Sequence, residues 1–112
     1  MKTKEKDAAP ARRSRKRLTV RFGPNQPEHI GYSANISSTG MMIRTGRVFA
    51  PGTRLHLEID IVPRALRLQG IVVWARAGDP RWIATGRIGM GLKFIHPPDN
   101  LMDCISPIAL PG

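Results

Sequence analysis

Short segments in which apolar and polar residues alternate recur along most of the chain. Segments 53–61 and 87–95 show the alternation most clearly, because every second residue of each is a large apolar one. A period of two places the apolar residues on one face of a β-strand. Weaker alternation, or a continuous apolar run, predicts four more strands at 18–22, 30–37, 41–45 and 66–75.

Two of these segments carry more specific expectations. In segment 30–37 the alternation predicts Ile30 and Tyr32 on the inner face, and it places Asn35 and Ser37 together on the outer face. Segment 66–75 becomes apolar on both faces near its end, which predicts a central strand with Trp74 in the core.

Turn-forming residues separate the six segments and define the fold class. The chain contains 11 Gly and 10 Pro, and all the prolines lie outside the predicted strands. After Pro97 and Pro98, Asp99 is placed to cap a short helix with Leu101, Met102 and Ile105 on its apolar side. The pattern predicts an all-β protein: a small, closed or nearly closed, six-stranded antiparallel β-barrel with a short C-terminal helix.

The 112 residues suffice for one small domain. Residues 1–11 are polar and lack apolar periodicity, so we expect a disordered N-terminal tail. The barrel domain is predicted over 12–106, including an Arg-rich arm at 12–17, and a C-terminal tail over 107–112.

Positive charge is concentrated at the N-terminus. The formal net charge is +10, of which residues 1–23 carry +7 and residues 24–112 only +3. This distribution predicts an anionic partner bound by a basic arm. No apolar stretch approaches the ~20 residues that span a bilayer, so we expect no membrane insertion and a cytoplasmic location. The lone Cys104 fits a reducing compartment.

The sequence argues against an enzyme. Its three histidines are dispersed, and no nucleophile, base and orienting group can be assembled from it. Gly86, Gly89 and Gly91 lie in or beside a predicted strand, whereas a phosphate-binding loop opens a helix. We therefore expect no catalytic residue, no metal and no cofactor.

Two short motifs remain. Arg13 and Arg17 form an RxxxR motif just before the first strand, and Asn35, Ser37 and Gly40 form an NxSxxG motif at a turn between strands. Arg17 and Arg21 form a second RxxxR copy, so the motif's register stays open.

Together these motifs and the strands around them resemble the PilZ domain, the bacterial receptor module for cyclic di-GMP. The resemblance covers about residues 12–96 and includes the strand-like segments 70–74 and 88–94. It implies a six-stranded split barrel with a C-terminal helix, and a ligand held between the basic arm and the outer barrel surface near the NxSxxG turn.

The resemblance also implies roles for single residues. Arg13 and Arg17 would grip guanine by its edge and face, because a guanidinium can both hydrogen-bond to O6 and N7 and stack. Arg12 would contact phosphate. Two polar side chains, Asn35 and Ser37, would reach the same ligand from one strand face.

The turn adds two further expectations. Gly40 would allow a positive φ and a close backbone approach. The family often has Asp at the first motif position, so Asn35 lacks one charge-assisted acceptor.

The leading hypothesis is a non-enzymatic cyclic di-GMP receptor whose arm becomes ordered over the ligand and signals to an effector protein. One alternative is a PilZ-like protein-interaction adaptor that binds no nucleotide. Another is a small nucleic-acid-binding barrel, which the low charge of residues 24–112 disfavours. The sequence leaves open the ligand stoichiometry, monomeric or intercalated dimeric, as well as the oligomeric state and the effector.

Overall fold

The computed structural model describes residues 13–14, 17–61, 64–85 and 88–105. Almost all of its regular structure is strand, as the alternating pattern predicts. The elements are β1 (Arg13–Ser14), β2 (Thr19–Gly23), β3 (His29–Ala34), β4 (Ile36–Ser37), β5 (Gly40–Arg44), β6 (Arg54–Ile59), β7 (Leu66–Arg76), the 3-10 helix η1 (Pro80–Thr85), β8 (Gly89–Ile95) and α1 (Leu101–Ile105).

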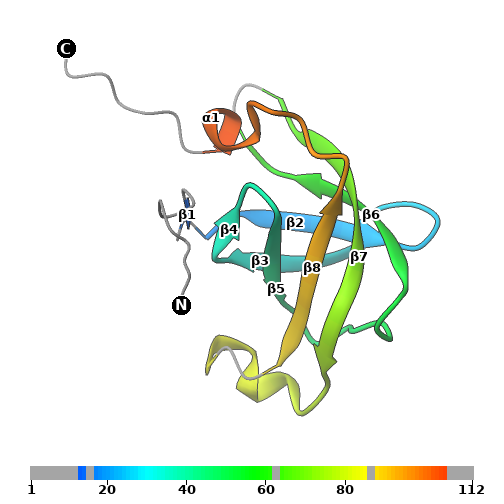
Figure 1. Cartoon of the computed structure of the whole chain (residues 1–112). Coiled ribbons are helices and arrows are strands. Elements are labelled where there is room, and N and C mark those ends of the chain that lie inside the picture. The colour runs from blue at the N-terminus through cyan, green and yellow to red at the C-terminus, as the bar shows by residue number, and fades with distance from the viewer. Residues whose placement is uncertain (1–12, 15–16, 62–63, 86–87, 106–112) are drawn as a thin grey trace, which may run out of the picture.

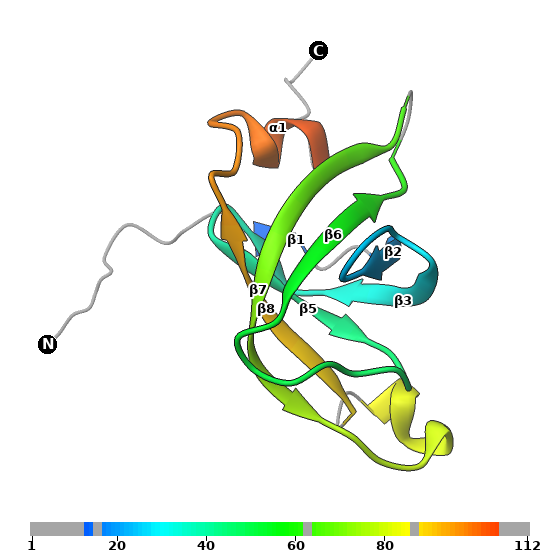
Figure 2. The same ribbon diagram turned by 90° about the vertical axis from the view of Figure 1, so that its right-hand side faces the viewer.

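Six of the strands close into an antiparallel barrel in the order β2-β3-β5-β8-β7-β6 (Figures 1 and 2). These strands correspond to the six predicted segments, so the predicted fold class is confirmed. Closure gives each of the six strands two neighbours, which leaves no unpaired sheet edge.

The core fills the barrel and continues under α1. Alternate residues of β6 and β8 point inward, as predicted, and Leu57 and Met90 are almost completely buried. Leu101, Met102 and Ile105 of α1 belong to the same apolar cluster. The helix therefore covers one end of the barrel, and η1 lies at the opposite end (Figure 1).

The predicted inner face of segment 30–37 is wrong at its start. Ile30 and Tyr32 are exposed, whereas Gly31 and Ser33 are buried. Burial of Ser33 is compensated because its hydroxyl accepts a hydrogen bond from the Leu18 backbone N–H at 2.9 Å. Asn35 then adopts a φ of 52° and divides the segment into β3 and β4.

The prediction that Trp74 lies in the core is also wrong. The pairing of β7 with β8 shifts by one residue between Val72 and Trp74, which marks a β-bulge. A bulge reverses the alternation beyond it, and Trp74 is 41% exposed on the outer surface. Val73 is exposed too, so this part of β7 is not covered on both faces.

The basic arm reaches the NxSxxG segment through its backbone. Arg13 pairs with Ser37 and Ser14 with Ile36 in the two-stranded sheet formed by β1 and β4. The predicted tails at 1–11 and 107–112, together with Arg12, lie outside the described residues. No helix in the described part of the chain is long and apolar enough to cross a membrane.

Candidate ligand-binding surface

The NxSxxG segment forms a tight turn that is stabilised by its own serine. Ser37 Oγ accepts hydrogen bonds from the backbone N–H groups of Thr39 and Gly40, each at 3.3 Å. It also lies 3.2 Å from Thr39 Oγ1 and 3.3 Å from the Gly40 carbonyl oxygen. The serine at this position therefore shapes the turn, as hydroxyls in such turns do.

Gly40 is required for a reason of space. A Cβ at this position would collide with the carbonyl oxygen of Leu92 on the neighbouring strand β8. The expected close backbone approach is therefore present. The expected positive φ is not found at Gly40, and Asn35 adopts that conformation instead.

A hollow of about 400 Å³, which we call the tryptophan hollow, lies against this turn. Its lining includes all three residues of the NxSxxG motif and the exposed end of β7: Asn35, Ser37, Gly40, Met41, Met42, Val73, Trp74, Gly91 and Leu92. The turn thus lies beside an aromatic ring that offers a stacking surface.

Gly91 determines how Trp74 lies in this hollow. The two residues are paired across β7 and β8, and a Cβ at Gly91 would overlap the indole ring. The missing side chain lets the indole lie close against the strand. The bulge and this glycine together give the tryptophan its place on the outer surface.

A second hollow, the arginine hollow, has a volume of about 350 Å³ and is lined by Arg17, Ser33, Ala34, Asn35 and Arg44. Asn35 lines both hollows, so they adjoin at this residue. The Arg17 guanidinium lies over the Tyr32 ring, 4.2 Å from its centroid. A cation–π contact of this kind holds the guanidinium against the outer face of β3, beside the arginine hollow.

The arginine hollow favours an anion electrostatically. It contains two guanidinium groups, from Arg17 and Arg44, and none of the described residues that line it is a carboxylate. The backbone pairing of Arg13 with Ser37 brings the basic arm to the same turn. Within the described residues, no three His, Cys, Asp or Glu side chains gather as metal ligands would.

The structure brings together most of the residues that the motifs singled out. Asn35, Ser37 and Gly40 share one hollow, Arg17 lines the other, and the Arg13 backbone lies beside Ser37. Arg12 lies outside the described residues. Arg21 lines neither hollow.

Sequence reasoning missed Trp74 and Arg44 as site residues. A continuous apolar run at 71–74 gave no sign of the bulge that exposes Trp74. Arg44 follows the NxSxxG motif by four residues on an alternating strand. Its outward position could have drawn attention to it.

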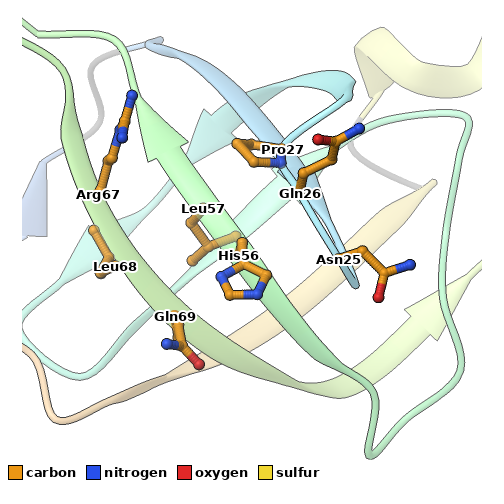
Figure 3. A pocket seen from close by; sticks show the side chains of 8 residues that line it. All are labelled: Asn25, Gln26, Pro27, His56, Leu57, Arg67, Leu68 and Gln69. Atoms are coloured by element: carbon orange, nitrogen blue, oxygen red, sulfur yellow. The ribbon is translucent and has the colours of Figure 1, made fainter.

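Another hollow, of about 360 Å³, lies on a different part of the barrel wall (Figure 3). His56, Arg67 and Gln69 come from β6 and β7, while the loop between β2 and β3 supplies Asn25, Gln26 and Pro27. Arg67 is already paired with Glu58 at 3.2 Å. No residue of either motif lines this hollow.

Comparisons with known proteins agree with the fold and with the resemblance to the PilZ family. The chain is similar to a Bacillus subtilis protein described as an inhibitor of motility (MotI/DgrA), with a TM-score of 0.60 and 24% identity. The match covers 83% of this chain and 47% of that one, and at this identity it shows the fold alone. No curated protein matches the chain. The sequence model of the PilZ domain matches residues 10–107. This chain therefore belongs to the PilZ domain family.

Proposed function

We propose that this protein is a cyclic di-GMP receptor and that the ligand binds across the tryptophan and arginine hollows. PilZ domains are receptor and adaptor modules for this dinucleotide, and the family assignment supports the class of function. The observation that carries the proposal is the position of Asn35, which lines both hollows, with Arg17 on one side and Trp74 on the other.

The chemistry of the two hollows suits the two parts of a guanine dinucleotide. The half-exposed indole of Trp74 offers a face on which a purine can stack. Arg17 carries hydrogen-bond donors that match guanine O6 and N7. The Asn35 amide offers a donor and an acceptor between them. Each hollow has the size typical of small-molecule sites, about 300–1,000 Å³.

The basic arm provides the signal in this proposal. Among the residues that the structure describes, the arm pairs with β4 through Arg13 and Ser14. Two strand residues bind weakly by themselves, and a dianionic ligand between the arm and the barrel would add charge-assisted contacts. The arm then becomes ordered over the ligand and presents a new surface to an effector protein.

Calorimetric titration with cyclic di-GMP tests the proposal. We expect one saturable binding event for the native chain, and loss of about 10- to 100-fold in affinity for Arg17→Ala, the range expected for a lost charge-assisted contact. Arg54→Ala removes an exposed arginine of β6 that lines neither hollow and serves as the matched control. The absence of binding at high micromolar ligand, or equal weakening by both variants, would contradict the proposal.

An adaptor without a nucleotide ligand is the second candidate. It is favoured by the hydrogen bonds that engage Ser37 Oγ within the turn, and by the exposed apolar side chains of Val73 and Trp74 next to it. The same titration separates the two functions, because an adaptor of this kind gives no heat with cyclic di-GMP.

A further inference from the structure

We infer that Arg44 binds a phosphate group in the arginine hollow and is a ligand-binding residue outside both sequence motifs. The inference rests on the proposed function, since the phosphate belongs to the bound dinucleotide. Arg44 is the last residue of β5, four positions beyond Gly40.

The first argument is an unsatisfied donor. Arg44 Nε is the one buried side-chain nitrogen or oxygen, among the residues that the structure describes, that has no hydrogen-bond partner. Leaving a buried charged donor unpaired is costly, and folded proteins rarely do so without a functional reason. An oxygen acceptor supplied by a ligand would satisfy it.

The second argument is the place of the side chain. Arg44 is paired across the strands with Tyr32 on one side and with Gly89 on the other. Tyr32 of β3 carries the Arg17 guanidinium on its ring. Arg17 lies just before β2 and Arg44 ends β5, and β3 lies between these two strands, so the two arginines line the same hollow from either side of β3. On the β8 side the two backbones lie so close that a Cβ at Gly89 would collide with the carbonyl oxygen of Ile43.

The third argument concerns the class of ligand group. Two guanidinium groups in one hollow repel each other, and no carboxylate is found among the described residues that line it. A dianionic or monoanionic phosphate removes this repulsion and can accept two parallel hydrogen bonds from one guanidinium edge. Of the other lining side chains, Ser33 and Ala34 are too small to stack on a base, and Asn35 carries no aromatic ring. Beside Arg44 the hollow therefore fits a phosphate better than a stacked guanine base, which finds its aromatic partner in the tryptophan hollow.

The test compares Arg44→Gln with Arg54→Gln in the full chain, using cyclic di-GMP and its phosphorothioate analogue. Sulfur replaces a phosphate oxygen in the analogue and leaves the guanine bases unchanged. We expect Arg44→Gln to weaken cyclic di-GMP binding by about 10- to 100-fold and to abolish the difference between the two ligands. Arg54→Gln should keep both the affinity and that difference. Arg44→Lys keeps the positive charge but cannot donate two parallel hydrogen bonds from a planar group, so it should recover only part of the affinity.

A second readout follows the Nε–H resonance of Arg44 by NMR during titration. A downfield shift on binding that is absent in Arg44→Gln identifies the resonance and supports the contact. Native affinity in Arg44→Gln, or a sulfur effect that persists in this variant, overturns the inference.

Failure of the proposed function gives a different result from failure of this inference. If the native chain does not bind cyclic di-GMP, the proposed function is wrong. Titration with inorganic phosphate then tests whether Arg44 binds an anion. A specific shift of its Nε–H resonance then assigns an anion site for free phosphate. No shift overturns the phosphate site altogether.

Discussion

Asn35 has a backbone role and a side-chain role that can be separated. Its φ of 52° lies in the left-handed region, which Asn and Gly adopt most readily among the amino acids. Its side chain is exposed and lines both hollows. The backbone role maintains the break between β3 and β4, and the proposed ligand role depends on the amide group alone.

Substitutions at Asn35 should divide these roles. Asn35→Gly should change the free energy of unfolding by only a few tenths of a kcal/mol, because glycine adopts this φ without strain, whereas Asn35→Ala should lose about 1 kcal/mol. Both should weaken cyclic di-GMP binding by a similar factor. Urea unfolding and calorimetry measure the two effects, and native affinity in Asn35→Gly would rule out a ligand contact by the amide.

Asp79 offers a pH-dependent prediction away from the site. A side-chain hydrogen bond from Arg81, followed by one from the Arg81 backbone N–H, holds the pKa of the exposed Asp79 carboxyl below its ordinary value. A folded-state pKa below the unfolded one stabilises the chain above the unfolded pKa, and this contribution disappears as pH falls through the folded pKa. Exposure to solvent keeps the contribution small.

Replacing Arg81 should reverse the lowering of the Asp79 pKa. In Arg81→Gln the pKa of Asp79 should rise toward the ordinary aspartate value, with the smaller backbone contribution remaining. NMR titration of the Asp79 carboxyl carbon in the native chain and in the variant measures this rise. An unchanged Asp79 titration in this variant would show that the side-chain hydrogen bond has no influence on the carboxyl.

At the scale of elements, the pairing of β7 with β8 decides whether the candidate site contains an aromatic ring. The bulge after Val72 directs Trp74 outward, and Gly91 leaves the space in which the indole lies. Neither feature alone would place the ring in the tryptophan hollow. A side chain at Gly91 should therefore affect the site through the tryptophan.

Gly91→Ala tests this dependence. The methyl group should displace the indole and lower the free energy of unfolding by about 1–3 kcal/mol, as overpacking does. Binding of cyclic di-GMP should weaken along with it. Trp74 fluorescence, measured in a Trp82→Phe background, should shift in wavelength in the absence of ligand. Unaltered fluorescence together with native binding would contradict the proposed position of the ring.

At the scale of the whole molecule, the described part of the arm adds no strand to the closed barrel. The barrel closes through six strands that do not include β1, which pairs with β4 alone. The N-terminal segment that includes the basic arm contributes much of the positive charge of the chain, since residues 1–23 carry +7 of the net +10. Ligand affinity should therefore depend on the arm far more than stability does.

Removal of residues 1–16 should lower the ligand affinity strongly and the stability only slightly. The shortened chain should still unfold cooperatively, with a loss of no more than about 1 kcal/mol for the short pairing with β4. Its affinity for cyclic di-GMP should fall by more than that of Arg17→Ala in the full chain. Thermal unfolding and calorimetry provide the measurements, and a collapse of cooperativity would show that the arm is part of the barrel's folding unit.

Much of the fold and part of the candidate site could be predicted from local patterns. Alternation in β6 and β8 identified strands and inner faces correctly, because a strand with one buried face repeats every two residues. The NxSxxG spacing located the turn. The positions of Ile30 and Tyr32 were predicted wrongly, since the left-handed φ at Asn35 divides a segment that reads as one strand. Positive φ at a single asparagine leaves no pattern in the neighbouring residues.

The amino-acid sequence by itself determined the six strands, the short helix and the two motifs, because these depend on residues close together in the chain. Only the tertiary structure decided that Trp74 faces outward and that Arg17 and Arg44 share a hollow at Asn35. Barrel closure sets which strands are neighbours, and a one-residue bulge reverses a face. Contacts between segments distant in the chain depend on that pairing, which no local pattern encodes.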